Sequence, residues 1–490
     1  MSASQAMILL DVTIVNVALP SIQRELGVSP SNLEWVVGAY TLVLAALILV
    51  GGSLGDRFGR KRMFLVGLAI FTVASAGCAL SGDDPQLIAF RAVQGVGGAA
   101  MAALTLSILV EAFPAQRRTA AIGVWAAIGG LGFGLGPVIG GVLVHVLDWS
   151  AIFWVNVPVA VVCGTLTAVG VQESRDPAAR RLDGLGAVLA AGGLFLLTFG
   201  LIESNRRSWA SPTVTGALAA AVIVLGAFVL WERHAASPMV PLSLLSERRF
   251  ASANVVFALL YLSLAGMFFF VTLYYQNARG WSALKTGLSW SILNTPFLAA
   301  SMNAGRLAAR YARGTLIGVG CLLAAAGMLL LAVLQGDTGF WVAAIGYALV
   351  GFGYGVAVPL VSSVAMSGIP APLAGTGSGI LNSARQIGAS VGLAVIGAIG
   401  VGLATHAWNN KVSTLPITIQ AQARTLDQQV AGAETRQVTA QLGQAAYEPA
   451  KDAFLTGYHA AMIATSVALM AAGATSFAGL RARALATTHV

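Results

Sequence analysis

The chain has 490 residues, of which 57% are hydrophobic and only 10% are charged, and its mean hydropathy is +0.80. Because a soluble domain carries about 25% charged residues, this composition excludes an ordinary soluble protein. The formal net charge of +9 at pH 7 does not indicate nucleic-acid binding, since the cations gather at the ends of apolar segments.

Apolar segments recur along nearly the whole chain, and each is long enough to cross a bilayer as a helix. They predict an all-α polytopic membrane protein with fourteen transmembrane helices. The expected spans are residues 3–23, 34–54, 63–81, 86–111, 120–145, 152–172, 184–203, 214–231, 250–276, 286–305, 314–335, 340–366, 375–404 and 458–480.

A short basic segment joins the second and third spans. Residues 52–62 read Gly-Ser-Leu-Gly-Asp-Arg-Phe-Gly-Arg-Lys-Arg. The positive-inside rule places this segment in the cytoplasm, and arginines in the other loops of the same side agree. We therefore expect both termini in the cytoplasm, and no signal peptide is expected. The excess of Arg over Lys, 24 to 4, and the abundant Ala and Gly favour the inner membrane of a bacterium. Few residues precede Asp11, which leaves open whether the natural N-terminus lies upstream of Met1.

An internal repeat divides the chain. Residues 305–313, Gly-Arg-Leu-Ala-Ala-Arg-Tyr-Ala-Arg, align with residues 52–60, and each copy joins the second and third helices of a six-helix unit. This repeat predicts two six-helix bundles with a binding site between them. The second copy has Ala309 in place of Asp56, so the two halves are not equivalent. The expected units are a first bundle at 1–173, two inserted helices with their loops at 174–249, and a second bundle at 250–490.

Residues 405–457 differ from the rest of the chain because they are rich in Gln, Ala and Thr and carry mixed charges. They predict a long polar outer loop with one or two surface helices. The loop is either a variable surface segment or a lid or docking surface.

Six motifs occur in a fixed order along the chain. They are the segment Leu10–Pro20, the basic segment Gly52–Arg62, the set Arg91, Gln94, Gly95 and Gly97, the set Gly132, Gly136, Pro137, Gly140 and Gly141, the set Trp149, Phe153, Asn156 and Pro158, and the segment Arg385–Gly388. Together they resemble the fourteen-helix drug:proton antiporters of the major facilitator superfamily, over residues 8–405 and the last helix. Ser150 departs from the arginine that is common in that family.

The resemblance implies the major facilitator fold and a proton-coupled antiporter that exports lipophilic small molecules or drugs by alternating access. The proton gradient supplies the energy, without a cofactor. The expected partners are a small lipophilic substrate, protons and membrane lipid, with a periplasmic adaptor left open and no nucleic acid. The alternatives are an exporter of one metabolite, such as an antibiotic or siderophore, and a non-transporting receptor. An enzyme is not expected, since the chain shows no Ser/His/Asp set and no phosphate-binding loop.

Asp11 is the only acid deep within an apolar helix of either predicted bundle. A charged carboxylate at mid-membrane costs several kcal/mol unless it is paired or protonated, so Asp11 is the predicted proton carrier. The alternative is a structural hydrogen bond to the backbone or to Asn16. Arg91 is the expected partner, and the resemblance implies that it helps Asp11 to release and accept its proton. The alternative for Arg91 is binding of a lipid phosphate.

Asp56 is the centre of a predicted conformational latch, together with Gly52, Arg57, Gly59 and Arg60. An acid here could cap the N-terminus of a helix in the other bundle, where the helix dipole is positive, and the expected helix begins near Gly314. The alternative is a local salt bridge with Arg57 or Arg60. Gly132, Gly136, Pro137, Gly140 and Gly141 form the antiporter motif of the fifth helix, which we interpret either as a hinge or sliding seam or as close packing.

Candidates for the substrate cavity are polar or aromatic side chains within apolar spans: Asn16, Tyr40, Gln94, Trp125, Phe269, Tyr274, Trp290, Tyr354 and Arg385. Arg385 either binds helix-end carbonyls or faces the cavity. Spans nine to thirteen contain no acid, which favours neutral, anionic or singly cationic substrates over dications. The five histidines lack ligand spacing and the three cysteines lie in separate apolar segments, so no metal site or disulfide is expected.

Overall fold

The computed structural model describes residues 1–26, 30–175, 183–206, 209–235, 238, 240, 242–335, 338–370 and 373–480, and within these ranges every regular element is a helix. The side chains of a few helical residues, Asn16 among them, lie outside the described part. The all-α prediction is therefore confirmed.

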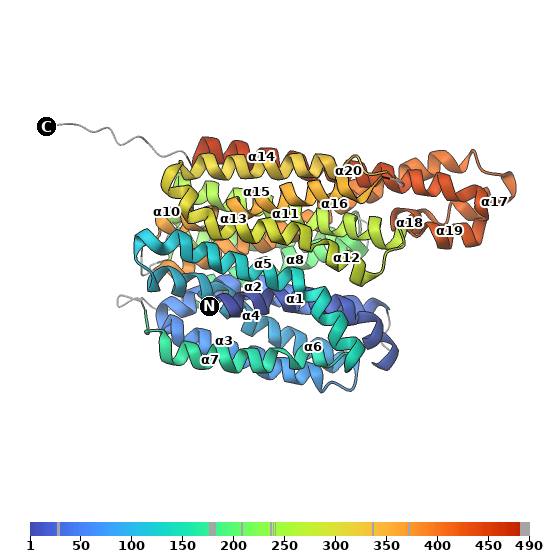
Figure 1. The fold of residues 1–490 in the computed structure, drawn as a ribbon. Coiled ribbons are helices and arrows are strands. Elements are labelled where there is room, and N and C mark those ends of the chain that lie inside the picture. Colours follow the sequence, from blue (N-terminus) through green and yellow to red (C-terminus); the bar gives the residue numbers. More distant parts are fainter. Residues whose placement is uncertain are drawn as a thin grey trace.

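The first half of the chain forms one group of packed helices, drawn from blue to teal in Figure 1. Its helices are α1 (Ser2–Leu26), α2 (Pro30–Phe58), α3 (Arg60–Ala79), α4 (Asp84–Ala112), α5 (Ala115–Val146), α6 (Ala151–Trp154) and α7 (Asn156–Gly170). Asp83 begins α4 as an N-cap, since its side chain accepts a hydrogen bond from the N–H of Gln86.

Three helices follow and connect the halves: α8 (Gly184–Arg206), α9 (Pro212–His234) and the short α10 (Leu242–Ser246). α8 and α9 pack against each other, and α8 also packs against α2 of the first half and α16 of the second. The inserted pair therefore lies beside the junction of the two halves.

The second half contains α11 (Arg248–Leu273), a π-helical turn (Tyr274–Ala278), α12 (Ala283–Ser289), α13 (Ser291–Arg310), α14 (Arg313–Leu331), α15 (Phe340–Ser367), α16 (Ala374–Val412) and α20 (Tyr447–Gly479). Most of the predicted spans fall on one long helix each. The exceptions are 152–172, which covers α6 and α7, 250–276, which ends in the π-helical turn after α11, and 286–305, which begins in α12 and continues into α13. Twelve described segments are long and apolar enough to cross a membrane, and α1 and α13 are not among them. α13 carries Asn294, Thr295 and Asn303 and packs between α5 and α15. The fold class agrees with the prediction, and the count of fourteen spans stays a prediction.

The repeat seen in the sequence has a structural counterpart. α2 and α3 are separated only by Gly59, and α13 and α14 only by residues 311–312. Gly67 in α3 packs against the backbone of Gly97 in α4, and Gly320 in α14 packs in the same way against Gly353 in α15. A glycine pair lets two helix backbones approach closely. Both halves therefore have a glycine contact between the third and fourth helices of the repeat.

The segment 405–457 is more ordered than expected. α16 and α20 extend past the other helices, and α17 (Ile417–Ala423), α18 (Asp427–Ala431), α19 (Thr435–Leu442) and a 3₁₀ turn (Gln444–Ala446) pack beside them. Buried apolar residues give this outer cap its own core, in which the Nε1 of Trp408 donates to the carbonyl of Ala423 at 2.8 Å. Figure 1 shows the cap at one end of the molecule, which we call the outer end. The opposite end, with Gly59 and α10, is the inner end.

The two halves meet along two seams. On one side α5 packs against α13 and α15, and on the other α2 and α4 pack against α16. At the inner end the hydroxyls of Thr119 and Ser363 lie 2.9 Å apart across the first seam. The amide of Asn382 donates to the carbonyl of Ala102 at 3.2 Å across the second. The inner ends of the halves are therefore joined in this structure.

Candidate functional site

Asp11 and Arg91 form a fully buried ion pair between α1 and α4. The Asp11 Oδ2 lies 2.6 Å from an Nη of Arg91, and both side chains are 0% exposed. The predicted pairing is present in the structure. An ion pair removed from water is held together strongly only when its remaining polar atoms are also bonded, so its surroundings decide what it can do.

The second carboxylate oxygen of Asp11 receives two amide donors. Gln94 Nε2 lies 3.0 Å and Asn156 Nδ2 3.1 Å from Oδ1. Asn156 Nδ2 also lies 3.0 Å from the hydroxyl oxygen of Ser75, which donates to the carbonyl of Phe153. All four polar side chains are buried. These bonds hold the carboxylate in one orientation.

Arg91 has further contacts that fix its guanidinium. Its Nε donates to the carbonyl of Val36 at 2.9 Å, and one Nη also donates to Gln94 at 2.6 Å. Its guanidinium carbon lies 4.4 Å from the ring centroid of Tyr40. The second Nη is buried without a hydrogen-bond partner. Arg91 therefore lies inside the bundle, and the interpretation as a residue that binds lipid phosphate at the surface is wrong.

Sequence reasoning missed the role of Ser75 and placed Asn156 only in a motif. A lone serine in an apolar helix has no signal of its own, because serine is common at membrane-helix contacts. Only the packing of α3 against α4, α6 and α7 brings Ser75 to Gln94 and Asn156, the two amide donors of Asp11.

Asp56 caps a helix of the other half, but not the helix that we expected. Its Oδ1 accepts from the backbone N–H of Gly375 at 2.8 Å, and its Oδ2 accepts from the backbone N–H and the hydroxyl of Thr376 at 2.7 and 3.0 Å. These donors belong to the first turn of α16. The prediction that Asp56 caps the helix beginning near Gly314 is wrong, because Asp56 binds the first turn of α16. Gly314 lies against Leu480 instead.

The local salt bridge considered for Asp56 is present as well. Arg60 Nε lies 2.9 Å from Asp56 Oδ1, and Arg60 also pairs with Glu111 of α4. Arg60 is buried, so it binds together α2, α3 and α4 at the inner end. Arg57 makes a different contact, with its guanidinium 5.2 Å from the centroid of the Phe58 ring.

Two glycines in the basic segment are required by close contacts. Gly52 lies against the backbone of Gly375, where a side chain would separate α2 from α16. Gly59 has a φ of 105°, a conformation that residues with a Cβ rarely adopt. It lies against Glu173, whose carboxylate accepts from the N–H groups of Lys61 and Arg62 at 3.0 Å each and so caps α3. Sequence reasoning did not identify Glu173 or Glu111.

The glycine motif of α5 lies on the face that contacts α1. A Cβ at Gly132 would collide with the backbone of Ala6, one at Gly136 with the side chain of Thr13, and one at Gly140 with Ile14. Gly141 differs, because the space around it is open. On the opposite side of α5, a Cβ at Gly134 would meet Asn294 of α13. α5 continues as a helix through Pro137. Its glycines allow close contacts on two sides, with α1 and with α13.

The aromatic candidates for the substrate cavity separate into groups. Tyr354 and Tyr274 donate their hydroxyls to the carbonyls of Leu260 and Gln335, at 2.6 and 2.5 Å, which ties helices and loops together. Trp290 packs in an outer aromatic cluster with Phe268 and Tyr347. Phe269 is 37% exposed on the surface of α11.

Tyr40 and Trp125 are buried, and the polar atom of each ring has no hydrogen-bond partner. Gln94 belongs to the Asp11 network described above. The assignment of these residues to a substrate cavity stays a prediction, and the side chain of Asn16 lies outside the described part.

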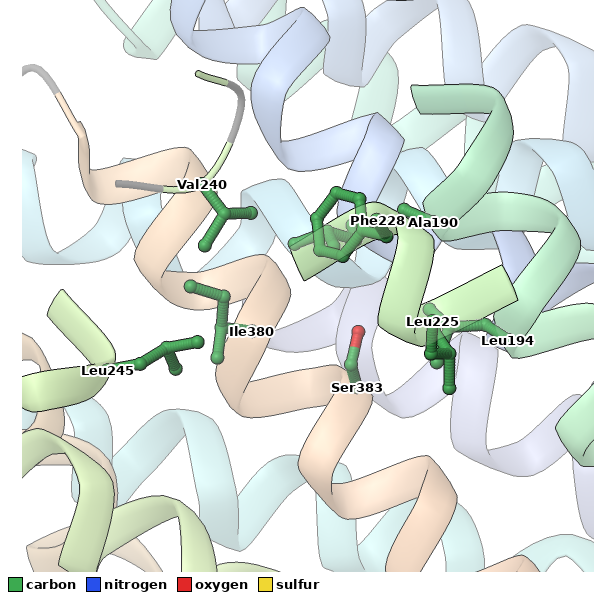
Figure 2. A pocket seen from close by; sticks show the side chains of 9 residues that line it. Ala190, Leu194, Leu225, Phe228, Val240, Leu245, Ile380 and Ser383 are labelled. Atoms are coloured by element: carbon green, nitrogen blue, oxygen red, sulfur yellow. The ribbon is translucent and has the colours of Figure 1, made fainter. Parts of the chain in front are cut away.

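An apolar cavity of about 130 Å³ lies elsewhere, between α2, the inserted helices and α16. Figure 2 shows Leu194 of α8, Phe228 of α9 and Ile380 and Ser383 of α16 around it. None of the predicted cavity residues lines it. Its lining is almost entirely aliphatic, so it offers few polar groups to orient a ligand.

Comparisons with known proteins agree with this architecture. The family model described as Major Facilitator Superfamily matches residues 1–393. The chain is 36% identical to the tetracenomycin C resistance and export protein of Streptomyces glaucescens over 396 residues, which are 80% of this chain and 73% of that one. It is 34% identical to the multidrug resistance protein Stp of Mycobacterium tuberculosis over 80% of this chain and 73% of Stp.

The human organic anion transporter MFSD10 has a similar fold, with a TM-score of 0.62 over 97% of each chain and 17% sequence identity. This likeness concerns the fold alone. The family model and the bacterial relatives match the sequence of this chain over about four fifths of its length. The protein is therefore a member of the Major Facilitator Superfamily of membrane transporters.

Proposed function

We propose that the protein is a proton-coupled antiporter that exports lipophilic small molecules, such as antibiotics or drugs, across the cytoplasmic membrane. The observation that carries this proposal is the buried Asp11–Arg91 pair within its network of amide donors. The names of the relatives, which are resistance and export proteins, support the substrate class.

In this proposal Asp11 gains and loses a proton during each transport cycle. In the ionised form it pairs with Arg91 and accepts from Gln94 and Asn156. Protonation removes the negative charge and weakens all three contacts, so α1 is held less firmly to α4 and α7. A change in the contact between α1 and its neighbours is the kind of local event that can bias alternating access.

The latch at Asp56 supplies the second part of the mechanism. It joins α2 to the N-terminus of α16 and closes the inner end, which we expect to face the cytoplasm because of the basic segment. Substrate uptake from the cytoplasm requires this contact to break. Proton entry from the outside and substrate release would occur while it is formed.

The test is transport into inverted vesicles under an imposed pH gradient, with a panel of lipophilic dyes and drugs. Asp11→Asn keeps the size of the side chain but cannot ionise, and we expect it to abolish gradient-driven transport. Asp148→Asn is the matched control, since Asp148 is exposed in a loop and bonds the N–H of Ser150. Normal active transport by well-inserted Asp11→Asn protein would contradict the proposal.

The same panel distinguishes a multidrug exporter from one dedicated to a single metabolite. One relative is named for a single antibiotic and another for multidrug resistance, so both remain candidates. Transport of several unrelated compounds supports the first. Transport of none of them, with proton release on addition of one natural product, supports the second.

A further inference from the structure

Arg385 in α16 is a buried cation that makes no ion pair with any described residue. Arg385 is 6% exposed, and its Nε is buried without a hydrogen-bond partner. Its guanidinium carbon lies 5.7 Å from the centroid of the Tyr261 ring. The expectation that Arg385 binds helix-end carbonyls finds no support in these contacts.

Such an arrangement is costly in an isolated protein. Burial of an unpaired cation in a low-dielectric region costs several kcal/mol, and arginine cannot escape the cost by losing its proton. α11, α13, α14 and α15 contain no Asp or Glu, and neither does α16. These five helices therefore offer Arg385 no carboxylate, and the acids of α18 and α20 lie in or next to the outer cap. An anion from outside the chain would fill this place.

The position of Arg385 places it between the halves. Asn382, one turn earlier in α16, reaches the backbone of α4 at Ala102, and Gly388, one turn later, packs on the backbone of α11 at Ala258. Gly379 faces α2 at Leu49. Arg385 lies about 9 Å along α16 from Gly379, in the direction of the outer end. It is therefore closer to the middle of the membrane than the contacts that close the inner end.

A second unpartnered group lies on the facing half. Tyr40 of α2 is 0% exposed, and its hydroxyl has no hydrogen-bond partner. Its ring lies on Arg91. Its hydroxyl points toward α4, since a Cβ at Gly98 would lie 3.0 Å from the hydroxyl oxygen, and Gly98 is one turn from Ala102, the residue that Asn382 of α16 contacts. A guanidinium and a phenol hydroxyl are both donors to an anion, and here they come from opposite halves of the protein.

We propose that Arg385 and the Tyr40 hydroxyl bind the acidic group, a carboxylate, sulfonate or phenolate, of a transported lipophilic molecule. This inference rests on the proposed export function and adds the chemical class of the substrate. The anion would neutralise Arg385 and satisfy Tyr40. The apolar part of the molecule would lie among the aromatic and aliphatic side chains of the seam.

The test uses two probes that differ by one acidic group, 1-anilinonaphthalene-8-sulfonate and N-phenyl-1-naphthylamine. Binding is measured by fluorescence with purified protein in phosphatidylcholine nanodiscs, and empty nanodiscs supply the background. We expect Arg385→Gln to weaken sulfonate binding about tenfold or more and to change binding of the neutral amine less than about twofold. Tyr40→Phe should weaken sulfonate binding by a smaller factor, and Arg385→Lys should retain most of it.

Two controls separate recognition from folding. Arg310→Gln removes an exposed arginine at the end of α13 and should leave both affinities unchanged. The thermal midpoint of Arg385→Gln should equal or exceed that of the wild type, because a buried unpaired charge has been removed. A structural role for Arg385 predicts the opposite shift. Equal weakening of both probes, or no change in sulfonate binding, would overturn the inference.

Lipid is the other source of an anionic group. Replacing part of the phosphatidylcholine by phosphatidylglycerol should leave sulfonate affinity nearly unchanged, and strong competition would assign the site to a lipid headgroup instead. The measurement needs no proton gradient, and Asp11→Asn should still bind the sulfonate. If sulfonate binding does not depend on Arg385 but transport is driven by the proton gradient, this inference alone is rejected. If sulfonate binding depends on Arg385 but no proton-driven transport is found, the antiport mechanism alone is rejected.

Discussion

Asp56 in α2 accepts two hydrogen bonds from Thr376 in α16, one from its backbone N–H at 2.7 Å and one from its hydroxyl at 3.0 Å. The first N–H groups of a helix have no partner within the helix, so this carboxylate caps α16 from the other half of the protein. The contact exists only while the inner ends of α2 and α16 lie together. It therefore connects the capping of one helix to the conformation of the whole transporter.

Asp56→Asn should shift the protein toward the state in which the inner end is open. The amide keeps the shape but loses the negative charge, and a charge-assisted hydrogen bond contributes about 1.5–3 kcal/mol, so the population ratio should change about tenfold or more. The reporter is Ser363→Cys, at a buried contact with Thr119, in a background without the native cysteines. Maleimide labelling of this cysteine should become faster.

Asp83→Asn is the matched control for this shift. Asp83 also caps a helix, since its carboxylate accepts from the N–H of Gln86 at 2.8 Å, but both residues belong to the first half. Its substitution should lower the thermal midpoint slightly and leave labelling unchanged. Identical labelling rates in Asp56→Asn and the wild type would show that the cap is not a latch.

Asn156→Ala should lower the rate of gradient-driven transport far more than Asn410→Ala, which changes an exposed residue in the outer part of α16. Asn156 donates to Asp11 and to Ser75, so its loss leaves Asp11 with two of its three hydrogen-bond partners. A hydrogen bond to a charged group contributes about 1.5–3 kcal/mol, so transport should fall about tenfold or more. Equal transport rates of the two well-inserted variants would show that Asn156 does not support the Asp11 network.

Gly136→Ala should impair the protein far more than Gly141→Ala. A Cβ at Gly136 would collide with Thr13 in α1, whereas the space at Gly141 is open. Overpacking of a tight contact costs about 1–3 kcal/mol, so Gly136→Ala should lower the thermal midpoint in detergent by several degrees and reduce transport. Equal behaviour of the two variants would show that α1 and α5 separate easily.

A dicationic dye should be transported at least about tenfold more slowly than a monocationic analogue of similar size. A second positive charge finds no carboxylate in α11 or α13–α16 and meets Arg385 instead, so its desolvation is not offset. Glu203 is buried in α8, near the outer end of that helix. Inverted vesicles with both dyes provide the measurement. Equal rates would place the binding site beside an acid such as Glu203 or Asp11.

Much of the fold was predictable because a membrane helix can be recognised from its own segment of sequence. Each span needs a long apolar segment, and the short basic segments between spans fix their relative orientation. The outer cap was harder to predict, because its helices are short and polar and depend on packing around Trp408. The π-helical turn at Tyr274–Ala278 was also missed. It meets the cap where Asn277 donates to the carbonyl of Gly432 at 2.7 Å.

The candidate site was predictable to the extent that its residues are out of place in an apolar helix. Asp11 and Arg91 stand out for that reason, and the structure joins them. Ser75 and Glu173 do not stand out, because serine is ordinary in membrane helices and an acid beside a loop is ordinary anywhere. Their partners come from other helices, so sequence spacing contains no information about them.

The sequence by itself determined that this protein is a helical membrane protein, since hydrophobic length and charge asymmetry act within each segment. Its internal repeat and the resemblance of its six motifs to a transporter family pointed to two bundles and to transport. The sequence also determined which residues cost free energy when buried: Asp11, Arg91 and Arg385. Only the tertiary structure decided which helix Asp56 caps and that Arg385 has no partner among the described residues. Those facts depend on how helices from the two halves are brought together, and the capping of α16 rather than α14 follows from the packing of α2 against α16.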